Sequence, residues 1–262
     1  LTTGKTRDVC QGADIEYLKS KDELLFVIPK MGAYTVDRKG NYRTIVEDNE
    51  ISHDIDPLPN GNFVYVRARV IKGDDEVREI TRSGHVVWRW SHAEYFPDRE
   101  KFLRNIPETI LEAWRGRLRV LFPDGIDWAH VNAVERYSDG DTLIALRNFS
   151  LFVIVGPKGR PKKIFKDIWL VHEPRRTKSG YIASDRSSGQ GRAQFSIVQV
   201  YDNGLRVNLL TGQFAAIRGI ELLPSGNFNI TSVGNVFEIN SDGRILHRMH
   251  LSIQSEDAER SL

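Results

Sequence analysis

Short apolar segments that are bounded by glycine-containing turns recur along the whole chain. Five of them read ELLFVI (residues 23–28), NFVYVR (62–67), TLIALR (142–147), YIASDR (181–186) and NFNITS (227–232). They are rich in β-branched and aromatic side chains, and polar residues interrupt the apolar positions. Segments of this length between turn residues are typical of β-strands. We therefore expect one strand in each of these places.

A second pattern follows each of these segments. It consists of a strand-like run, a tight glycine turn and another strand-like run, and it reads AYTVDRKGNYRTI, VREITRSGHVVWRW, FVIVGPKGRPKKIF, IVQVYDNGLRVNLL and VFEINSDGRILHRM. Asx-x-Gly and Ser-Gly turns supply the positive φ that hairpin turns require. The turn glycines, at positions 40, 84, 159, 204 and 243, lie about 40–45 residues apart except for one longer interval.

This repeat determines the expected fold class. A period of about 40–45 residues with about four strands in each unit is typical of a β-propeller. We count five units and predict an all-β propeller of five four-stranded blades, with six blades as the alternative. A β-sandwich is the competing all-β fold, but it would not explain a repeated phrase.

The spacing of the repeat also predicts the domain organisation. We expect one propeller domain over residues 13–251, with an N-terminal tail (1–12) and a C-terminal tail (252–262). The long interval holds an insertion, 91–127, in which PETILEAWRGRL has the helical spacing of apolar residues that predicts a short surface helix. The segment ADIEYL near the N-terminus is expected to supply an outer strand that closes the ring against the last unit.

Composition and charge narrow the classes of function. The 262 residues carry a net charge of +2 with both signs spread along the chain, which gives no case for a nucleic acid as partner. The lone Cys10 excludes an internal disulfide framework and a CxxC metal site. No uninterrupted apolar run is long enough to span a bilayer, so we expect no transmembrane segment in this chain.

Polar residues recur at a similar distance before the hairpin glycines. In a propeller, equivalent positions that lead into the innermost strands surround the axis, so their side chains are expected to converge at one mouth of the central channel. His53, His172 and Arg218 lie eight positions before Gly61, Gly180 and Gly226. His130 lies ten positions before Gly140, where we expect a turn two residues longer.

Arginines occupy matching places after the turns, at Arg67, Arg147 and Arg186. Guanidinium groups offer fixed forks for sulfate, phosphate or carboxylate oxygens, so these residues and Arg218 predict an anion site. A neutral imidazole acts as a nucleophile or as a general acid or base, and transfer of an anionic group uses both kinds of side chain. Three histidines could instead hold zinc or copper, but the arginines would repel the cation, so we expect neither metal nor cofactor.

Three phrases resemble the arylsulfotransferase-like propellers of bacteria and archaea. They are HDIDPLPNGNFVY, DWAHVNAVERYSDGDTLIALRN and VHEPRRTKSGYIASDRSSGQGRAQFSIVQVY. The ending GIELLPSGNFNITSVGNVFEINSDGRILHRM is similar to the closing blades of the same family. The resemblance covers about residues 24–249, and DWAHVN followed by LIALRN is its most specific part.

The resemblance implies a sulfuryl transfer that does not use the nucleotide sulfate donor. A phenolic sulfate ester gives its sulfuryl group to a histidine in the channel, and a phenol then accepts it. His172 matches the histidine that is sulfurylated, His53 and His130 match the assisting histidines, and Arg147 matches the arginine that binds the transferred group. The family also implies a small anionic aryl substrate and an extracytoplasmic location, periplasmic or at the cell surface.

A function of a different class stays open beside this enzyme. The propeller could be a non-catalytic platform that binds a protein partner, for instance as the extracytoplasmic domain of a membrane-attached protein. An enzyme needs an open, partly aromatic pocket, whereas in a platform the 91–127 insertion could plug the channel. The basic residues Arg175, Arg176 and Lys178 fit either function. We interpret the remaining histidines, His85, His92, His247 and His250, as surface or packing residues.

Overall fold

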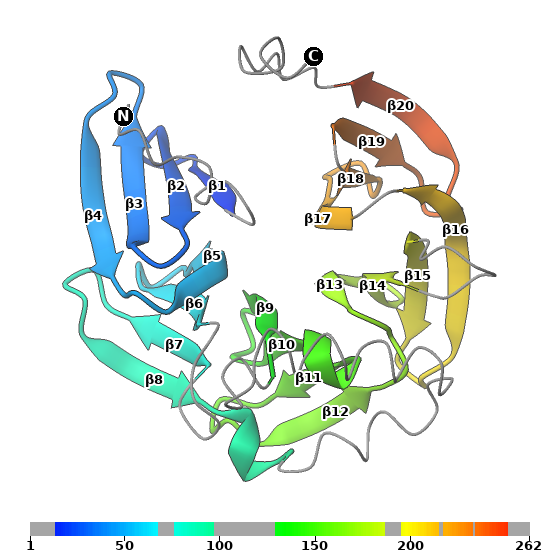
Figure 1. Cartoon of the computed structure of the whole chain (residues 1–262), viewed down its shortest axis with the longest axis horizontal. Coiled ribbons are helices and arrows are strands. Elements are labelled where there is room, and N and C mark those ends of the chain that lie inside the picture. The colour runs from blue at the N-terminus through cyan, green and yellow to red at the C-terminus, as the bar shows by residue number, and fades with distance from the viewer. Residues whose placement is uncertain are drawn as a thin grey trace, which may run out of the picture. The chain divides into compact units, whose positions relative to one another are not determined.

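The structure is a computed structural model that describes residues 14–67, 76–96, 129–186, 195–214, 217–232 and 234–250. The chain divides into two compact units, Leu1–Val171 and His172–Leu262. Over the described ranges, three four-stranded antiparallel sheets belong to the first unit and two to the second (Figure 1).

The first unit contains the sheets that are built from β1 to β12. The first sheet consists of β1 (Ile15–Leu18), β2 (Glu23–Ile28), β3 (Gly32–Asp37) and β4 (Tyr42–Glu47). The second consists of β5 (Ile51–Pro57), β6 (Phe63–Arg67), β7 (Val77–Ile80) and β8 (Val86–Trp90). The third consists of β9 (Val131–Arg136), β10 (Thr142–Leu146), β11 (Leu151–Val155) and β12 (Pro161–Phe165).

The second unit contains two sheets of the same design. The fourth sheet consists of β13 (His172–Thr177), β14 (Gly180–Asp185), β15 (Phe195–Tyr201) and β16 (Arg206–Phe214). The fifth consists of β17 (Ile217–Leu222), β18 (Phe228–Ser232), β19 (Asn235–Ile239) and β20 (Ile245–His250).

Each sheet is a meander in which neighbouring strands follow one another in the chain. The five strand segments predicted from the apolar pattern are the second strands, and the five strand-turn-strand phrases are the third and fourth strands. Glycine is required in the turns between the first and second strands of the second and third sheets, since Gly61 and Gly140 have φ values of 83° and 84°, which side chains rarely tolerate. The predicted all-β fold of five four-stranded blades is therefore confirmed.

Apolar side chains fill the space between consecutive sheets of a unit. In the first unit, one core joins Leu25 and Val27 of β2 to Ile51 and Ile55 of β5, and a second core joins the second sheet to the third. In the second unit, Phe214 of the fourth sheet packs edge to face on Phe237 of the fifth, with their ring centroids 5.1 Å apart. Within each unit, a neighbouring sheet therefore covers the apolar face of each sheet. Strands in which apolar and polar residues alternate require such a cover for their apolar face.

Two sequence predictions differ from the structure or lie outside it. The segment IEYL forms β1, which pairs with β2 inside the first sheet, so the prediction of an outer strand for the last unit is wrong. Of the 91–127 insertion, the structure describes Ser91 to Phe96, which include the short 3-10 helix η2 (His92–Glu94). The expected helix in PETILEAWRGRL and both predicted tails lie outside the described residues. Within the described ranges, no helix is long and apolar enough to cross a membrane.

Candidate functional site

His53 and His130 lie side by side in the first unit. His53 is in β5, and His130 comes directly before β9 of the next sheet. Their ring centroids are 4.8 Å apart and their ring planes meet at 82°, so one imidazole points its edge at the other. Both side chains are half-buried, and Nδ1 of His53 is hydrogen-bonded to the Ser52 hydroxyl, which orients its ring. Two imidazoles are therefore close enough to contact the same small group.

Both histidines have an unusual backbone conformation. The φ of His53 is 55° and that of His130 is 48°, in the left-handed region that residues other than glycine rarely occupy. In β5 the register with β6 shifts between Ser52 and Ile55, so His53 lies in a β-bulge. Such conformations cost on the order of 1 kcal/mol and concentrate at functional sites, where the surrounding contacts hold them in place.

A buried carboxylate holds this bulge against the next sheet. Asp54 has no exposed surface, and its Oδ2 accepts a hydrogen bond of 2.6 Å from the backbone N–H of Val134 in β9. Because Asp54 directly follows His53 and Val134 lies four residues beyond His130, this bond fixes the two histidine-bearing segments relative to each other.

Arg147 begins next to His130. Strand β10 ends at Leu146 and continues into the 3-10 helix η4 (Arg147–Phe149). The backbone N–H of Arg147 donates to the carbonyl of His130 at 3.2 Å. The half-buried guanidinium donates from Nε and Nη2 to Oδ1 of Asn148, each at 3.3 Å. The first unit therefore brings His53, His130 and Arg147, three of the predicted site residues, into one region.

Asn132 also belongs to this region and was not among the predicted site residues. The side chain is 1% exposed, and its Nδ2 donates to the carbonyl of Val171 at 2.9 Å. Its Oδ1 is buried and has no hydrogen-bond partner in the described part of the chain. Val171 directly precedes His172, so Asn132 holds the peptide that leads into the fourth sheet. The available signal was its place in DWAHVN, two residues after His130.

The strand registers correct the predicted alignment of His130. The turn before Gly140 runs from residue 137 to 141, between the pair Arg136–Thr142, and has the same length as the turn at 58–62 in the second sheet. The prediction of a longer turn is therefore wrong. Counted from the end of the strand, Asn132 takes the place that His53 has in β5.

The alignment of His172 is also shifted, by one residue. The hairpin between β13 and β14 has only two turn residues, because Thr177 pairs with Gly180. Counted from this end, Glu173 takes the place of His53, and its φ of 43° agrees with that assignment. Arg218 does keep the place of His53, in a bulge of β17 between Ile217 and Gly219. Its side chain lies outside the described part of the structure.

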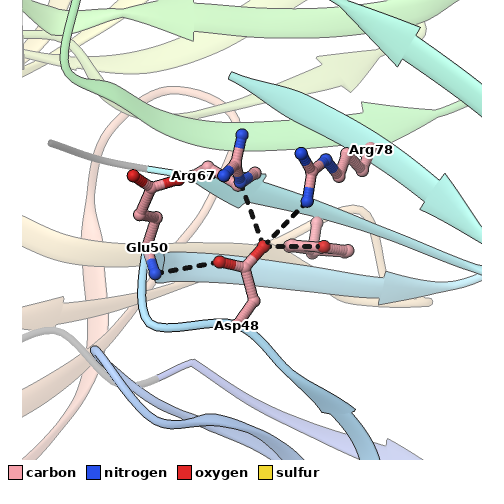
Figure 2. A network of polar contacts seen from close by, with 5 residues as sticks. Asp48, Glu50, Arg67 and Arg78 are labelled. Carbon is pink, nitrogen blue, oxygen red and sulfur yellow. Dashed lines mark hydrogen bonds and ion pairs between the residues drawn. The ribbon is translucent and has the colours of Figure 1, made fainter. Parts of the chain in front are cut away.

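Arg67 lies in a network of charged side chains in which it and Asp48 are buried (Figure 2). Its Nε donates to Oδ2 of Asp48 at 3.0 Å, and its Nη2 forms an ion pair with Glu50. Arg78 and the Tyr65 hydroxyl contact the same Asp48 oxygen, at 3.3 and 3.0 Å. Burial, and then the Asp48 charge, raise the pKa of the Tyr65 phenol above its ordinary value. Two carboxylates thus balance Arg67, and these contacts do not favour its predicted role in anion binding.

In the second unit, His172 and Arg186 share one aromatic neighbour. The His172 ring lies edge to face with Phe195 at 6.5 Å, and the Arg186 guanidinium lies over the same ring at 5.7 Å. His172 is only 7% exposed, and Ser184 Oγ accepts from its N–H and donates to its carbonyl, at 3.0 and 3.2 Å. A histidine and an arginine therefore both contact the aromatic ring that begins β15.

The remaining predicted features are simpler. His85, His247 and His250 are exposed and His92 is fully buried, which agrees with the interpretation of the four as surface or packing residues. Arg175 contacts Glu173 at 3.0 Å and donates to the Ile220 carbonyl at 3.2 Å, so it joins the fourth and fifth sheets. Over the described ranges, no group of three or more His, Cys, Asp or Glu side chains is arranged to hold a metal ion.

Comparison with solved structures shows the same fold in many proteins. A gluconolactonase from Xanthomonas campestris has a TM-score of 0.63 and 11% identity, and the match covers 91% of this chain and 76% of that one. The WD40 β-propeller domain of Doa1 has a TM-score of 0.59 and 12% identity, with 91% and 68% covered. A protein of unknown function from Bacteroides caccae has a TM-score of 0.58 and 16% identity, with 92% and 82% covered. These likenesses show the β-propeller fold alone.

Sequence comparison identifies the family. The search of curated protein sequences found no match. The family model described as "Arylsulfotransferase (ASST)" matches residues 3–165, which is more than half of the chain. The matched region contains His53, His130, Arg147 and Asn132, and it ends before His172. The chain therefore belongs to the arylsulfotransferase family.

Proposed function

We propose that this protein transfers a sulfuryl group from a phenolic sulfate ester to a phenol, with His172 as the covalent carrier. His53 and His130 move the protons, and Arg147 binds the sulfuryl oxygens. The family supports the class of reaction. The single observation that carries the proposal is the pairing of His53 with His130 at 4.8 Å, next to the start of Arg147.

The reaction has two balanced halves. In the first, a ring nitrogen of His172 attacks sulfur, the N–S bond forms and the bond from sulfur to the phenolic oxygen breaks. The leaving phenolate takes a proton from His53 or His130. In the second half, the acceptor phenol returns a proton to that imidazole, its oxygen attacks sulfur, and the N–S bond breaks. The guanidinium of Arg147 stabilises the charge on the sulfuryl oxygens in both halves.

The backbone conformations of the two assisting histidines support these roles. Left-handed residues that are not glycine are retained when the surrounding structure requires them. The buried Asp54 and the Ser52 hydroxyl hold His53 in its conformation, and the hydrogen bond from the Arg147 N–H holds the His130 carbonyl. A proton-transfer pair needs this kind of fixed geometry, because efficient transfer requires hydrogen-bond distances.

The test is the intact mass of the protein after brief exposure to 4-nitrophenyl sulfate. We expect the addition of one sulfuryl group and the release of one nitrophenol, both lost in His172→Ala. His85→Ala is the matched control, because His85 is an exposed histidine in the turn between β7 and β8. A folded wild-type protein that neither gains mass nor releases nitrophenol would refute the proposal.

Two observations favour a non-catalytic platform as the second candidate. His172 is 7% exposed, and two carboxylates balance the charge of Arg67. On this alternative, the polar residues stabilise the blades, and the protein binds a partner through its surface. The discriminating measurement is the binding of 4-nitrophenyl sulfate by calorimetry: a platform shows no heat of binding, whereas the enzyme binds the ester and loses affinity in Arg147→Ala.

A further inference from the structure

Glu76 and His92 form a buried pair that the proposed reaction does not use. Glu76 is 2% exposed and His92 has no exposed surface. One carboxylate oxygen of Glu76 is bonded to Nδ1 of His92, and the other accepts the His92 backbone N–H at 2.9 Å. The backbone of Glu76 is itself fixed, since its carbonyl accepts from Arg67 at 2.7 Å and its N–H donates to Trp90 at 2.9 Å.

The geometry determines where the imidazole carries its proton. Nδ1 faces a carboxylate oxygen and therefore donates to it. Nε2 is buried and has no hydrogen-bond partner in the described residues. The bond to Glu76 therefore fixes which edge of the imidazole faces the carboxylate. The ring is thus oriented by Glu76 and presents its other side to apolar neighbours.

Those neighbours connect the pair to Arg147. The His92 ring lies 5.4 Å from the ring of Phe149, which is fully buried and ends the 3-10 helix η4. The His92 carbonyl accepts the N–H of Phe96 at 2.7 Å, and the Phe96 ring lies 6.4 Å from Phe149. The ring of His92 and the ring of Phe96, whose backbone is bonded to His92, therefore both pack against Phe149. Phe149 lies two residues after Arg147.

We propose that Glu76 and His92 are positioning residues for Arg147. Glu76 fixes the His92 ring, the ring and Phe96 fix Phe149, and Phe149 fixes the short helix η4 that carries the guanidinium. A 3-10 helix of three residues has little stability of its own, so its geometry depends on such contacts. This inference rests on the proposed function for its kinetic consequence, but the positioning itself is independent of turnover.

The test uses two variants and one control in the full chain. His92→Asn keeps an N–H donor for Glu76 and removes the ring from Phe149. Glu76→Gln keeps the shape of the carboxylate and removes its charge, and it replaces the first variant where that one does not fold. Phe165→Leu is the control, because Phe165 is a buried ring of β12 that stacks on Phe152 in the same unit, at 4.7 Å.

The first measurement is the Nε–H resonance of Arg147 in a nitrogen–proton NMR spectrum, assigned with Arg147→Lys. We expect it to shift or broaden in His92→Asn and to stay unchanged in Phe165→Leu. The second is steady-state kinetics with 4-nitrophenyl sulfate, in which kcat/KM falls roughly tenfold or more through a higher KM, because a misplaced guanidinium binds the ester less well.

The outcomes separate this inference from the proposed function. If the wild-type protein is inactive, the sulfuryl-transfer proposal fails, and the Arg147 resonance still tests the positioning. An Arg147 resonance that is the same in His92→Asn as in the wild-type protein would overturn the inference. Equal changes in His92→Asn and Phe165→Leu would overturn it as well, since the effect would then follow from lost stability alone.

Discussion

The charge network around Asp48 gives the sharpest prediction for stability (Figure 2). Asp48 accepts hydrogen bonds from Arg67 at 3.0 Å, Arg78 at 3.3 Å, Tyr65 at 3.0 Å and the backbone N–H of Glu50 at 2.9 Å. The side chains of Asp48 and Arg67 are only 7% and 8% exposed. Asp48→Asn keeps the size of the side chain and removes its charge, so Arg67 loses this carboxylate partner and retains its ion pair with Glu50.

Removing one partner of a buried ion pair typically costs about 3–5 kcal/mol. Glu50 stays in place and is 29% exposed, so solvent reaches part of the network. We therefore expect the low end, about 3 kcal/mol, for Asp48→Asn. For a unit of this size, that loss lowers the melting temperature by roughly 6–12 °C.

The assay is thermal unfolding followed by circular dichroism. Asp22→Asn is the matched control, because Asp22 also pairs with an arginine, Arg38, but their side chains are 47% and 78% exposed. Exposed pairs contribute little, so this control should melt with the wild-type protein. If Asp48→Asn lowers the melting temperature no more than Asp22→Asn does, the reasoning from burial is wrong.

Three further predictions concern the first unit. Burial raises the pKa of Tyr65 above 10.0, so the stability that its neutral phenol contributes is present below pH 10 and is lost as the pH rises further. Urea unfolding from pH 9 to 11 should therefore show a smaller loss of unfolding free energy in Tyr65→Phe than in the wild-type protein. Equal losses would contradict this. Trp90→Phe removes the bond of 3.0 Å from the buried indole to the Gly159 carbonyl and should lower the free energy of unfolding by about 1–3 kcal/mol in the same urea assay; an unchanged midpoint would count against it. Asp54→Ala leaves the Val134 N–H without its buried acceptor, so it should cost about 1–3 kcal/mol and speed hydrogen exchange at that amide, with unchanged exchange as the contrary result.

The strands and turns could be predicted because their signals are local. A run such as NFVYVR between turn residues is compatible with few structures other than a strand, and β6 (Phe63–Arg67) lies there. The pairing of a short strand is not local in this sense. Nothing in the segment IEYL specifies the strand with which it pairs. β1 pairs with β2 because the hairpin from Leu18 to Glu23 brings the two strands together.

The sequence predicted which side chains lie close together in the first unit better than it predicted the alignment of the repeats. His53 and His130 do meet, as the repeated phrases suggested. Glycine alone does not reveal the length of a turn, however: Gly61 lies in a turn, whereas Gly180 already begins β14, so counting back from both glycines compares different positions. The shift from His172 to Glu173 follows from that difference in turn length.

Contacts between distant segments explain what the sequence could not show. Arg67 has the same spacing from its glycine as Arg186, but Asp48 and Glu50 of the preceding loop surround it. Asn132 has the composition of an ordinary polar position, and its role depends on the Val171 carbonyl, which comes from 39 residues further along the chain. Such partners are defined only once the sheets have packed together.

The left-handed conformations of His53 and His130 have a consequence for protein engineering. Glycine or asparagine adopts such a backbone with less strain, so His53→Gly should relieve a local cost of the order of 1 kcal/mol. A redesign that ranks substitutions by folding energy alone would therefore replace these two imidazoles early. Under the proposed function, thermostabilised variants of this protein should be selected with both positions held constant, because improved stability and the proposed proton transfer favour different residues there.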